Sequence, residues 1–183
     1  MTLVEWRRQN AVNIDGVFLS VKYAIPAMRR SGWGRIVLFA SEDAVQPYVD
    51  ELAYCASKAG ILSLAKGLSK AYGCDNVLVN TVSPAFIATP MTDALTDAQK
   101  AKLTESIPLG RMGAPADIAS AVVYLLSPAA GFINGAVIRV DGGVPTARHT
   151  WKLEPARQDF TYNGFPLYKP PQAFSDQHKG EKS

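Results

Sequence analysis

Three short apolar runs, separated by long helical stretches, limit the fold of this chain most. The runs are Arg35–Phe39, Val77–Val82 and Ala136–Val140. Helical patterns fill the intervals at about 2–31, 52–72, 92–106 and 116–126. Strands that alternate with helices pair in parallel through right-handed crossovers. The sequence therefore predicts an α/β fold, with a doubly wound sheet of about three parallel strands and helices on its flanks.

Tyr54 and Lys58 lie four residues apart in the second helical stretch, and Ser41 follows the first apolar run. Positions i and i+4 share one face of a helix, so the Lys58 ammonium is expected near the Tyr54 phenol, where it would lower the phenol pKa. Moving a tyrosine pKa from about 10 to about 7 takes roughly 4 kcal/mol, and an exposed ion pair gives only about 0.2 to 1 kcal/mol. We therefore expect a sheltered site in which Tyr54 acts as a general acid or base.

Asn13 completes an ordered set with these three residues, and the set resembles the active site of the short-chain dehydrogenase/reductase family. The resemblance runs from about Leu3 to Gly143. It implies that Tyr54 exchanges a proton with the substrate and that Lys58 holds the nicotinamide ribose. It also implies that Ser41 orients the substrate oxygen and that Asn13 joins a proton relay through water.

Each of these residues also has a simpler interpretation. Tyr54 and Lys58 can form a solvated pair on a helix surface, Ser41 can be a turn residue or a helix cap, and Asn13 can face water in the middle of a helix.

A proline ends the second apolar run, because proline lacks the N–H group that a strand ladder needs. In the family, the loop that follows contacts the nicotinamide carboxamide. The resemblance assigns cofactor binding to five residues, Tyr54, Lys58, Pro84, Ile87 and Thr89. The family usually has glycine after this proline, whereas this chain has Ala85, which is expected to change how the loop meets the cofactor. A plain connection between a strand and a helix is the simpler interpretation.

The chain lacks one feature of dinucleotide-binding folds. Such folds hold the pyrophosphate on a glycine-rich turn between a strand and a helix N-terminus. No Gly-x-x-x-Gly-x-Gly sequence occurs here. The resemblance therefore implies a partial Rossmann-like fold made of the last three strands of the family's sheet. It implies NAD or NADP as the cofactor, and we expect this chain by itself to bind the cofactor weakly or not at all.

Composition excludes several other classes of protein. A hydrophobic content of 48% with 19% charged residues is typical of a globular protein. The net charge of +3 is too small to argue for nucleic acid, and no apolar run is long enough to span a membrane. Two cysteines favour a reducing cytoplasm over a disulfide framework.

The composition changes near the C-terminal end of the chain. After Val144, prolines and aromatic residues are interspersed without a helical or strand period. We therefore predict two parts, a catalytic part at 1–143 and an arm at 144–183. The arm is expected either to lay its aromatic side chains on its own domain or on a neighbouring subunit, or to be an unstructured tail.

The expected function is an oxidoreductase that uses NAD or NADP to interconvert a small secondary alcohol and a carbonyl. The alternative is a non-catalytic remnant that serves as a dimerisation or interaction subunit, because the sequence offers nothing to hold the pyrophosphate. An epimerase or dehydratase with the same Tyr-x-x-x-Lys pattern fits less well, since the family's compact reductases end their sheet with a turn like Asp141-Gly142-Gly143.

A homo-oligomer is also implied by the resemblance, with contacts through the helices at 2–31 and 52–72. The helix at 52–72 carries several small residues that would let helices of two copies approach closely across a two-fold axis. These residues are Ala53, Ala56, Ala59 and Gly60. The alternative is that these residues only fit the helix against its own sheet.

Overall fold

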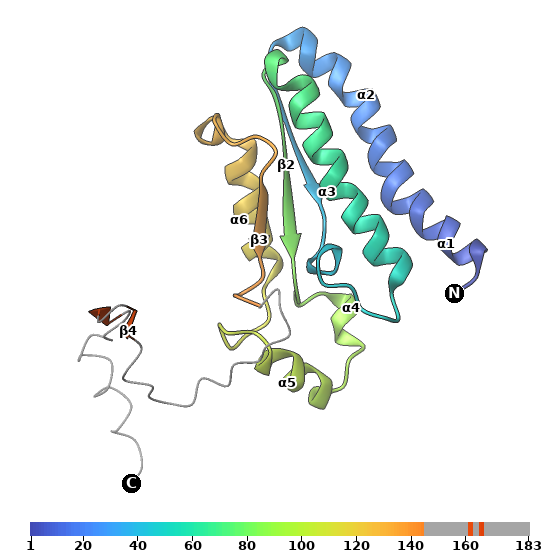
Figure 1. The fold of residues 1–183 in the computed structure, drawn as a ribbon, viewed down its shortest axis with the longest axis vertical. Helices are drawn as coiled ribbons and strands as arrows, with labels where there is room; N and C mark the ends of the chain where they lie inside the picture. Colours follow the sequence, from blue (N-terminus) through green and yellow to red (C-terminus); the bar gives the residue numbers. More distant parts are fainter. Residues whose placement is uncertain (145–160, 163–164, 167–183) are drawn as a thin grey trace. The chain divides into compact units, whose positions relative to one another are not determined.

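The computed structural model of the chain describes residues 1–144, 161–162 and 165–166, and it divides the chain into two units, residues 1–148 and 149–183. The first unit alternates helices and strands along the chain (Figure 1). Its elements are α1 (Leu3–Asn10), α2 (Gly16–Ser31), β1 (Gly34–Phe39), α3 (Leu52–Tyr72), β2 (Val77–Pro84), α4 (Pro90–Asp93), α5 (Asp97–Glu105), α6 (Pro115–Leu126) and β3 (Val137–Val140). Short 3₁₀ turns lie at Glu42–Ala44, Gly73–Asp75 and Pro128–Ala130.

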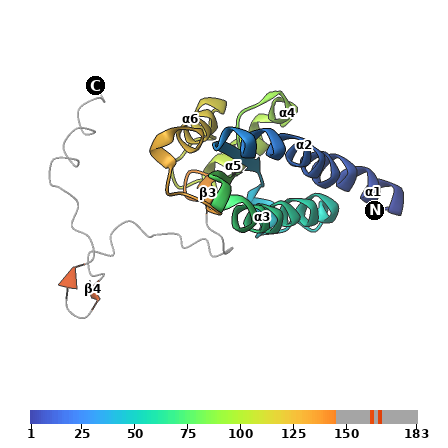
Figure 2. The same cartoon turned by 90° about the horizontal axis from the view of Figure 1, so that it is seen from above.

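The three strands of the first unit form one parallel sheet in the order β1-β2-β3. In the register of the sheet, Phe39 of β1 lies opposite Val82, and Pro84 lies opposite Val140 of β3. Helices α2 and α3 cover one face of this sheet and α6 covers the other (Figures 1 and 2). The predicted α/β fold with three parallel strands is confirmed.

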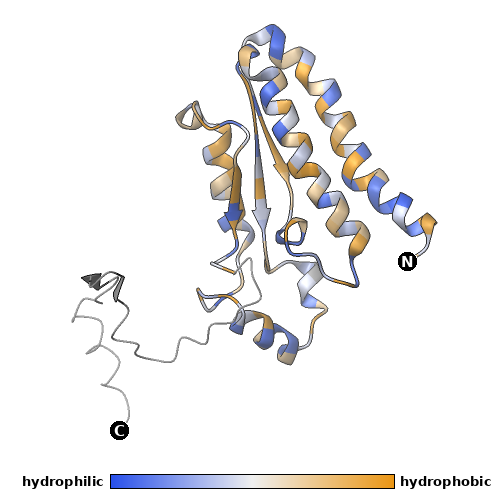
Figure 3. Ribbon diagram, viewed as in Figure 1, coloured by the Kyte–Doolittle hydropathy of each residue, from blue (hydrophilic) through white to orange (hydrophobic). Residues whose placement is uncertain are grey.

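Each face of the sheet has its own hydrophobic core. Val79 packs with Ile61 of α3 and Ile25 of α2 on one face. On the other face, Val82 packs with Ile118 and Leu125 of α6, a helix that Figure 3 shows as predominantly hydrophobic. All six side chains are buried. Packing on both faces of the sheet fixes the positions of the strands. It therefore also fixes the strand ends, where the predicted site lies.

Two asparagine side chains fasten β2 to the segment before β3. The Asn80 amide, which is 1% exposed, accepts a hydrogen bond from Ala136 N at 3.0 Å and donates one to Ile133 O at 2.8 Å. Asn134 accepts from Val79 N at 2.9 Å and donates to Ser69 O at 3.0 Å. These side-chain hydrogen bonds satisfy backbone N–H and C=O groups that have no partner in the strand ladder.

The first predicted helix, at 2–31, forms with one irregularity. Residues Ala11–Asp15 make a π-helical turn between α1 and α2. Thr2 caps the start, where its hydroxyl accepts from Glu5 N at 3.2 Å, and Gly32 ends the helix in the left-handed conformation. A π turn inserts one residue into the helix and changes the direction of its side chains.

The prediction of a single helix at about 92–106 is wrong. Two helices occupy this stretch, α4 and α5, and they are separated at Thr96. Thr96 has an extended backbone and its hydroxyl accepts from Gln99 N at 3.3 Å, so it begins a new helix. A capping threonine competes with helix continuation, which the hydrophobic pattern alone does not show.

In the second unit, the structure describes two short strands. Thr161–Tyr162 (β4) pairs antiparallel with Phe165–Pro166 (β5). The rest of the predicted arm after residue 144 lies outside the described residues. Across the described parts of the chain, no helix is long and apolar enough to cross a membrane.

Candidate active site

Side chains from three segments meet where β1 ends. Ser41 follows β1 and begins the 3₁₀ turn Glu42–Ala44, while Tyr54 and Lys58 lie in the first turns of α3. Asn13 lies in the π-helical turn that packs against α3. Ligand sites of open parallel sheets lie outside the carboxyl ends of the strands, and this is such a position.

Gly60 allows the π-helical turn to approach α3 closely. A Cβ atom at Gly60 would lie only 2.8 Å from Cδ1 of Ile14, the residue after Asn13. The Asn13 amide then donates to Ser57 Oγ at 2.9 Å, and Ser57 Oγ donates to the Tyr54 carbonyl at 2.7 Å. Asn13 is therefore tied to the helix turn that carries Tyr54 and Lys58, and it does not simply face water.

Ser41 is a buried residue with several partners. Its hydroxyl donates to Asp43 Oδ2 at 2.9 Å and accepts from Asp43 N at 3.2 Å, and it is hydrogen-bonded with the Tyr54 side chain. Ser41 therefore both caps the 3₁₀ turn and contacts Tyr54. The simpler interpretation as a cap is confirmed, and the interpretation as a site residue stays a prediction.

Lys58 lies beside Tyr54 as the helix spacing predicts. Its Nζ is 5.5 Å from the centroid of the Tyr54 ring and donates to the Phe39 carbonyl at 2.9 Å. Both side chains are half-buried, so they are not a solvated surface pair. Burial lowers the pKa of Lys58, because a buried ammonium loses its hydration.

The expected lowering of the Tyr54 pKa does not occur in this structure. Burial raises the pKa of Tyr54 above its ordinary value, because it disfavours the phenolate. The hydrogen bond with Ser41 acts in the opposite direction, while the charges of Asp43 and Glu51 raise the Tyr54 pKa further. The phenol is therefore protonated at neutral pH.

A cavity of about 780 Å³ opens beside Tyr54. Its lining carries four acidic residues: Glu5, Asp43, Asp50 and Glu51. Asp43 and Ser57, which contact the predicted residues directly, were not singled out from the sequence. The Ser-x-Asp spacing could have indicated Asp43, because a serine hydroxyl can form hydrogen bonds with the backbone and the side chain of the residue two positions later.

The loop after β2 is held in a fixed shape. Ile87 forms a parallel bridge with Gly113, and Ala88 N donates to Gly113 O at 2.8 Å. Thr89 N donates to Thr92 Oγ1 at 2.9 Å at the start of α4. Ala85 does not have a positive φ, so alanine in place of glycine causes no backbone strain. Pro84 ends β2 as predicted, and none of these contacts brings Pro84, Ile87 or Thr89 to the four residues around Tyr54.

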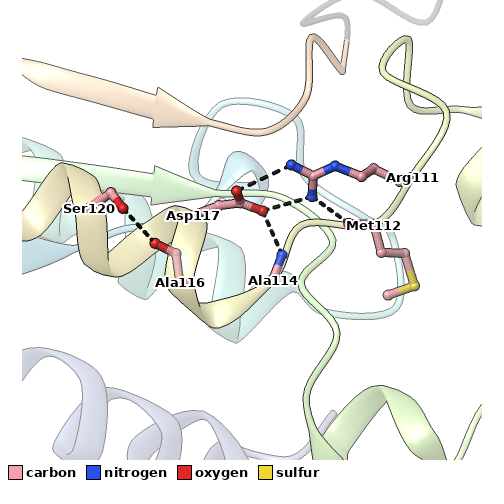
Figure 4. Close-up of polar contacts among 6 residues, drawn as sticks. All are labelled: Arg111, Met112, Ala114, Ala116, Asp117 and Ser120. Carbon is pink, nitrogen blue, oxygen red and sulfur yellow. Dashed lines mark hydrogen bonds and ion pairs between the residues drawn. The ribbon is translucent and has the colours of Figure 1, made fainter.

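An ion pair holds the other side of this loop at the start of α6 (Figure 4). Asp117 accepts from Arg111 Nη1 at 2.7 Å and from Ala114 N at 2.7 Å. The hydrogen bond from Arg111 lowers the pKa of Asp117 to about 2, and the bond from the Ala114 amide adds to this lowering. Asp117 therefore caps α6 as a carboxylate, and it fixes the segment against which Ile87 packs.

The site fits one end of a dinucleotide better than the other. Lys58 offers a cation for a nicotinamide ribose, and the loop carrying Ile87 and Thr89 offers backbone groups, but no described contact joins Lys58 to this loop. Among residues 1–144, by contrast, β1 is followed by Ser41-Glu42-Asp43 and β2 by Ala85-Phe86-Ile87. Neither connection is the glycine-rich turn that a pyrophosphate needs. Two acidic residues after β1 would repel a phosphate.

Known proteins resemble the chain over the first unit. The sequence model described as enoyl-(acyl carrier protein) reductase matches residues 1–145. The 3-oxoacyl-[acyl-carrier-protein] reductase FabG of Aquifex aeolicus (strain VF5) is 40% identical over 144 residues, which are 79% of this chain and 58% of that protein. The chain thus spans little more than half the length of this relative.

Solved structures agree with the sequence comparison. A short-chain dehydrogenase/reductase, glucose/ribitol dehydrogenase, from Brucella melitensis matches with a TM-score of 0.73 and 36% identity over 80% of this chain and 59% of that one. A gluconate 5-dehydrogenase from Burkholderia cenocepacia J2315, in complex with NADP and tartrate, matches with a TM-score of 0.76 and 28% identity, covering 80% of this chain and 58% of that chain.

Proposed function

The chain belongs to the short-chain dehydrogenase/reductase family, and from that premise we propose that the site around Tyr54 interconverts a secondary alcohol and a carbonyl with NAD or NADP. One observation carries the proposal. Ser41 from the end of β1 is hydrogen-bonded with the half-buried Tyr54 of α3, and the Lys58 ammonium lies 5.5 Å from the same ring. A phenol between a hydroxyl and a cation, beside a cavity, is equipped for proton transfer to an oxygen.

In the direction of reduction, Tyr54 donates its proton from Oη to the carbonyl oxygen as that oxygen gains negative charge. Ser41 orients the same oxygen, and Lys58 places a positive charge beside the phenolate that forms. The nicotinamide supplies the hydride when it is bound. Asn13, fastened to α3 through Ser57, holds the helix turn in place and belongs to the relay that returns a proton to Tyr54.

Cofactor contacts are proposed for the residues that match the family's positions. Lys58 and Tyr54 hold the nicotinamide ribose, and the loop of Pro84, Ile87 and Thr89 meets the carboxamide. The fixed shape of this loop supports that role, because the Ile87–Gly113 bridge and the Thr89–Thr92 bond set its backbone. Nothing within residues 1–144 matches a pyrophosphate site, so we expect weak binding of the dinucleotide by this chain.

The substrate is proposed to be a small carbonyl compound or secondary alcohol. The relatives' names cover a 3-oxoacyl-[acyl-carrier-protein] reductase and a gluconate 5-dehydrogenase, and both reactions fit this proton donor. The test is to incubate the chain with excess NADPH and either a 3-oxoacyl thioester or a keto sugar acid. Oxidation of NADPH with stoichiometric formation of the alcohol supports the proposal, and no alcohol from any carbonyl at saturating cofactor contradicts it.

A second function is favoured by the missing pyrophosphate turn. In this alternative the chain is a non-catalytic interaction subunit that keeps the helix pair α2 and α3 for association. It predicts no turnover under the conditions above while self-association is retained. The two free cysteines, buried Cys55 and exposed Cys74, fit a reducing compartment such as the cytoplasm under either function.

We also propose that the chain forms a homo-oligomer through α2 and α3. Ala53 is buried against the chain's own core, so part of the simpler interpretation holds. Ala56 is exposed, however, and large apolar side chains are exposed on α2, with Phe18 at 51% and Tyr23 at 73%. Exposed aromatic residues on α2, together with an exposed small residue on α3, are typical of helices that another copy covers.

Replacing Ala56 with arginine should dissociate this oligomer. In a symmetric contact the charge appears on both sides, where it is buried without a partner. Sedimentation of the variant and the wild type at equal concentration measures the effect. Ala101→Arg on α5 is the matched control, since Ala101 is also an exposed helical alanine. A monomeric wild type, or an Ala56→Arg chain as large as the wild type, would show that α3 is not the contact.

A further inference from the structure

Backbone hydrogen bonds anchor the loop after β2 to Gly113, which lies far along the chain. Gly113 N donates to Phe86 O at 3.0 Å, and Ala88 N donates to Gly113 O at 2.8 Å, so the two bonds enclose Ile87. A Cβ atom at Gly113 would lie only 2.5 Å from Cδ1 of Ile87, so glycine allows this close approach. The position of the Ile87 backbone therefore depends on the position of Gly113.

The Asp117 carboxylate binds the chain on both sides of Gly113 (Figure 4). Arg111, two residues before Gly113, donates to Asp117 Oδ2 at 2.7 Å and to Oδ1 at 3.2 Å. Ala114 N, directly after Gly113, donates to Asp117 Oδ2 at 2.7 Å. Hydrogen bonds to a carboxylate are stronger than those between neutral groups, and a bidentate arginine also fixes the geometry. One side chain thus holds the 111–114 segment in place.

We propose that Asp117 is a positioning residue for the nicotinamide end of the cofactor, and that it acts through Gly113 on the loop that carries Ile87. The carboxylate holds the 111–114 segment, and the backbone bonds of Gly113 hold the loop. The role in cofactor binding rests on the proposed function, which assigns the carboxamide contact to this loop. The series of hydrogen bonds does not rest on it, because it involves only residues of this chain.

Other contacts of the loop do not replace the bonds to Gly113. The Thr92 hydroxyl of α4 lies 3.3 Å from Ile87 O and 2.8 Å from Thr89 O, but α4 is a four-residue helix that directly follows the loop. These bonds shape the loop without tying it to the sheet. Ile87 also packs against the core between β2 and α6. Apolar packing is not directional, so it does not fix where backbone groups point.

Two measurements separate the anchoring of the loop from its role in binding. Hydrogen exchange of the Ala88 amide reports how firmly the loop is held, and it needs no cofactor. Fluorescence titration with reduced nicotinamide mononucleotide reports whether the anchored loop binds the nicotinamide end. Because Asp117→Ala removes charge-assisted hydrogen bonds, we expect it to speed the exchange of the Ala88 amide about tenfold or more. It should weaken binding of the mononucleotide by a similar factor, about tenfold.

Further variants separate the two bonds that Asp117 makes. Asp117→Asn keeps an oxygen for Ala114 N but loses the charge, and Arg111→Met loses the ion pair but keeps the bond to Ala114 N. Both should fall between the wild type and Asp117→Ala in both measurements. The control is Asp75→Ala, which removes the ion pair with Arg29, also 2.7 Å long and of similar exposure, from the turn before β2. It should change neither measurement.

Exchange of the Val79 amide, which bonds to Asn134 within the sheet at 2.9 Å, distinguishes a released loop from a weakened fold. It should stay as slow in Asp117→Ala as in the wild type. Unchanged exchange at Ala88, or faster exchange at both Ala88 and Val79, would overturn the proposal, because Asp117 would then not act on the loop in particular.

Binding of the mononucleotide decides the remaining step of the proposal. Faster exchange at Ala88 alone, with binding as tight as in the wild type, would overturn the role of Asp117 in cofactor binding. A wild-type chain that does not bind the mononucleotide at all contradicts the cofactor contacts of the proposed function. In that case the exchange at Ala88 still decides whether Asp117 holds the loop.

Discussion

Replacing Tyr54 with phenylalanine should lower the turnover of carbonyl reduction by about 100-fold or more, the usual scale of general acid help. The substitution removes one oxygen and keeps the half-buried ring, so packing on α3 is almost unchanged. Ser41 and Lys58 stay in place, but neither replaces the proton donor. The Ser41 hydrogen is held by Asp43, and the Lys58 ammonium donates to the Phe39 carbonyl.

Turnover of Tyr54→Phe is to be compared with that of Tyr72→Phe, a matched change at the other end of the same helix. The control should turn over like the wild type. If Tyr54→Phe also kept near-normal turnover while its fold was intact, proton transfer would have to come from another group, and the assignment of Tyr54 would be wrong.

Replacing Asn80 with alanine should cost about 3 kcal/mol of the free energy of unfolding. The change deletes two part-buried hydrogen bonds of the buried Asn80 side chain and leaves Ala136 N and Ile133 O without their partner. A buried polar group without a partner costs about 1 to 3 kcal/mol, which is a large part of the total stability of a domain. The loss should act on both cores, because β2 lies between them.

Urea denaturation measures this loss, with Asn10→Ala as the control. The Asn10 amide donates to Trp6 O at 2.9 Å, but that bond is exposed, so water can replace it. A drop for Asn80→Ala no larger than for Asn10→Ala would mean that β2 and the segment before β3 are held by packing alone.

Much of the fold can be predicted from the sequence, because the hydrophobic pattern of each segment favours the same element that tertiary packing stabilises. The α3 boundaries match the prediction, since Leu52 and Tyr72 enclose an uninterrupted helical pattern. The helix break within 92–106 does not follow from the sequence pattern, because Thr96 resembles any polar helix residue unless its capping bond is known. The π-helical turn likewise has no periodic signature, because it adds one residue to a continuous helix.

The relative positions of Ser41, Tyr54 and Lys58 can be predicted from the sequence, but the electrostatics around them cannot. Spacing on a helix places Lys58 near Tyr54, and a strand end places Ser41, so these positions follow from the chain order. The Tyr54 pKa depends instead on burial and on Asp43 and Glu51, which face the phenol from two different segments. The burial of Tyr54 and its distances from Asp43 and Glu51 are set by tertiary packing, which the sequence pattern does not encode directly.

The most direct test of the account compares two ligands, NADPH and the shorter reduced nicotinamide mononucleotide, by nicotinamide fluorescence. We propose that only the nicotinamide end of the cofactor binds to this chain, through Lys58 and the loop after β2. The two ligands are therefore expected to bind within about threefold of each other, and Lys58→Ala should weaken both. NADPH binding tighter than the mononucleotide by about tenfold or more would reveal a hold on the rest of the dinucleotide and contradict the account.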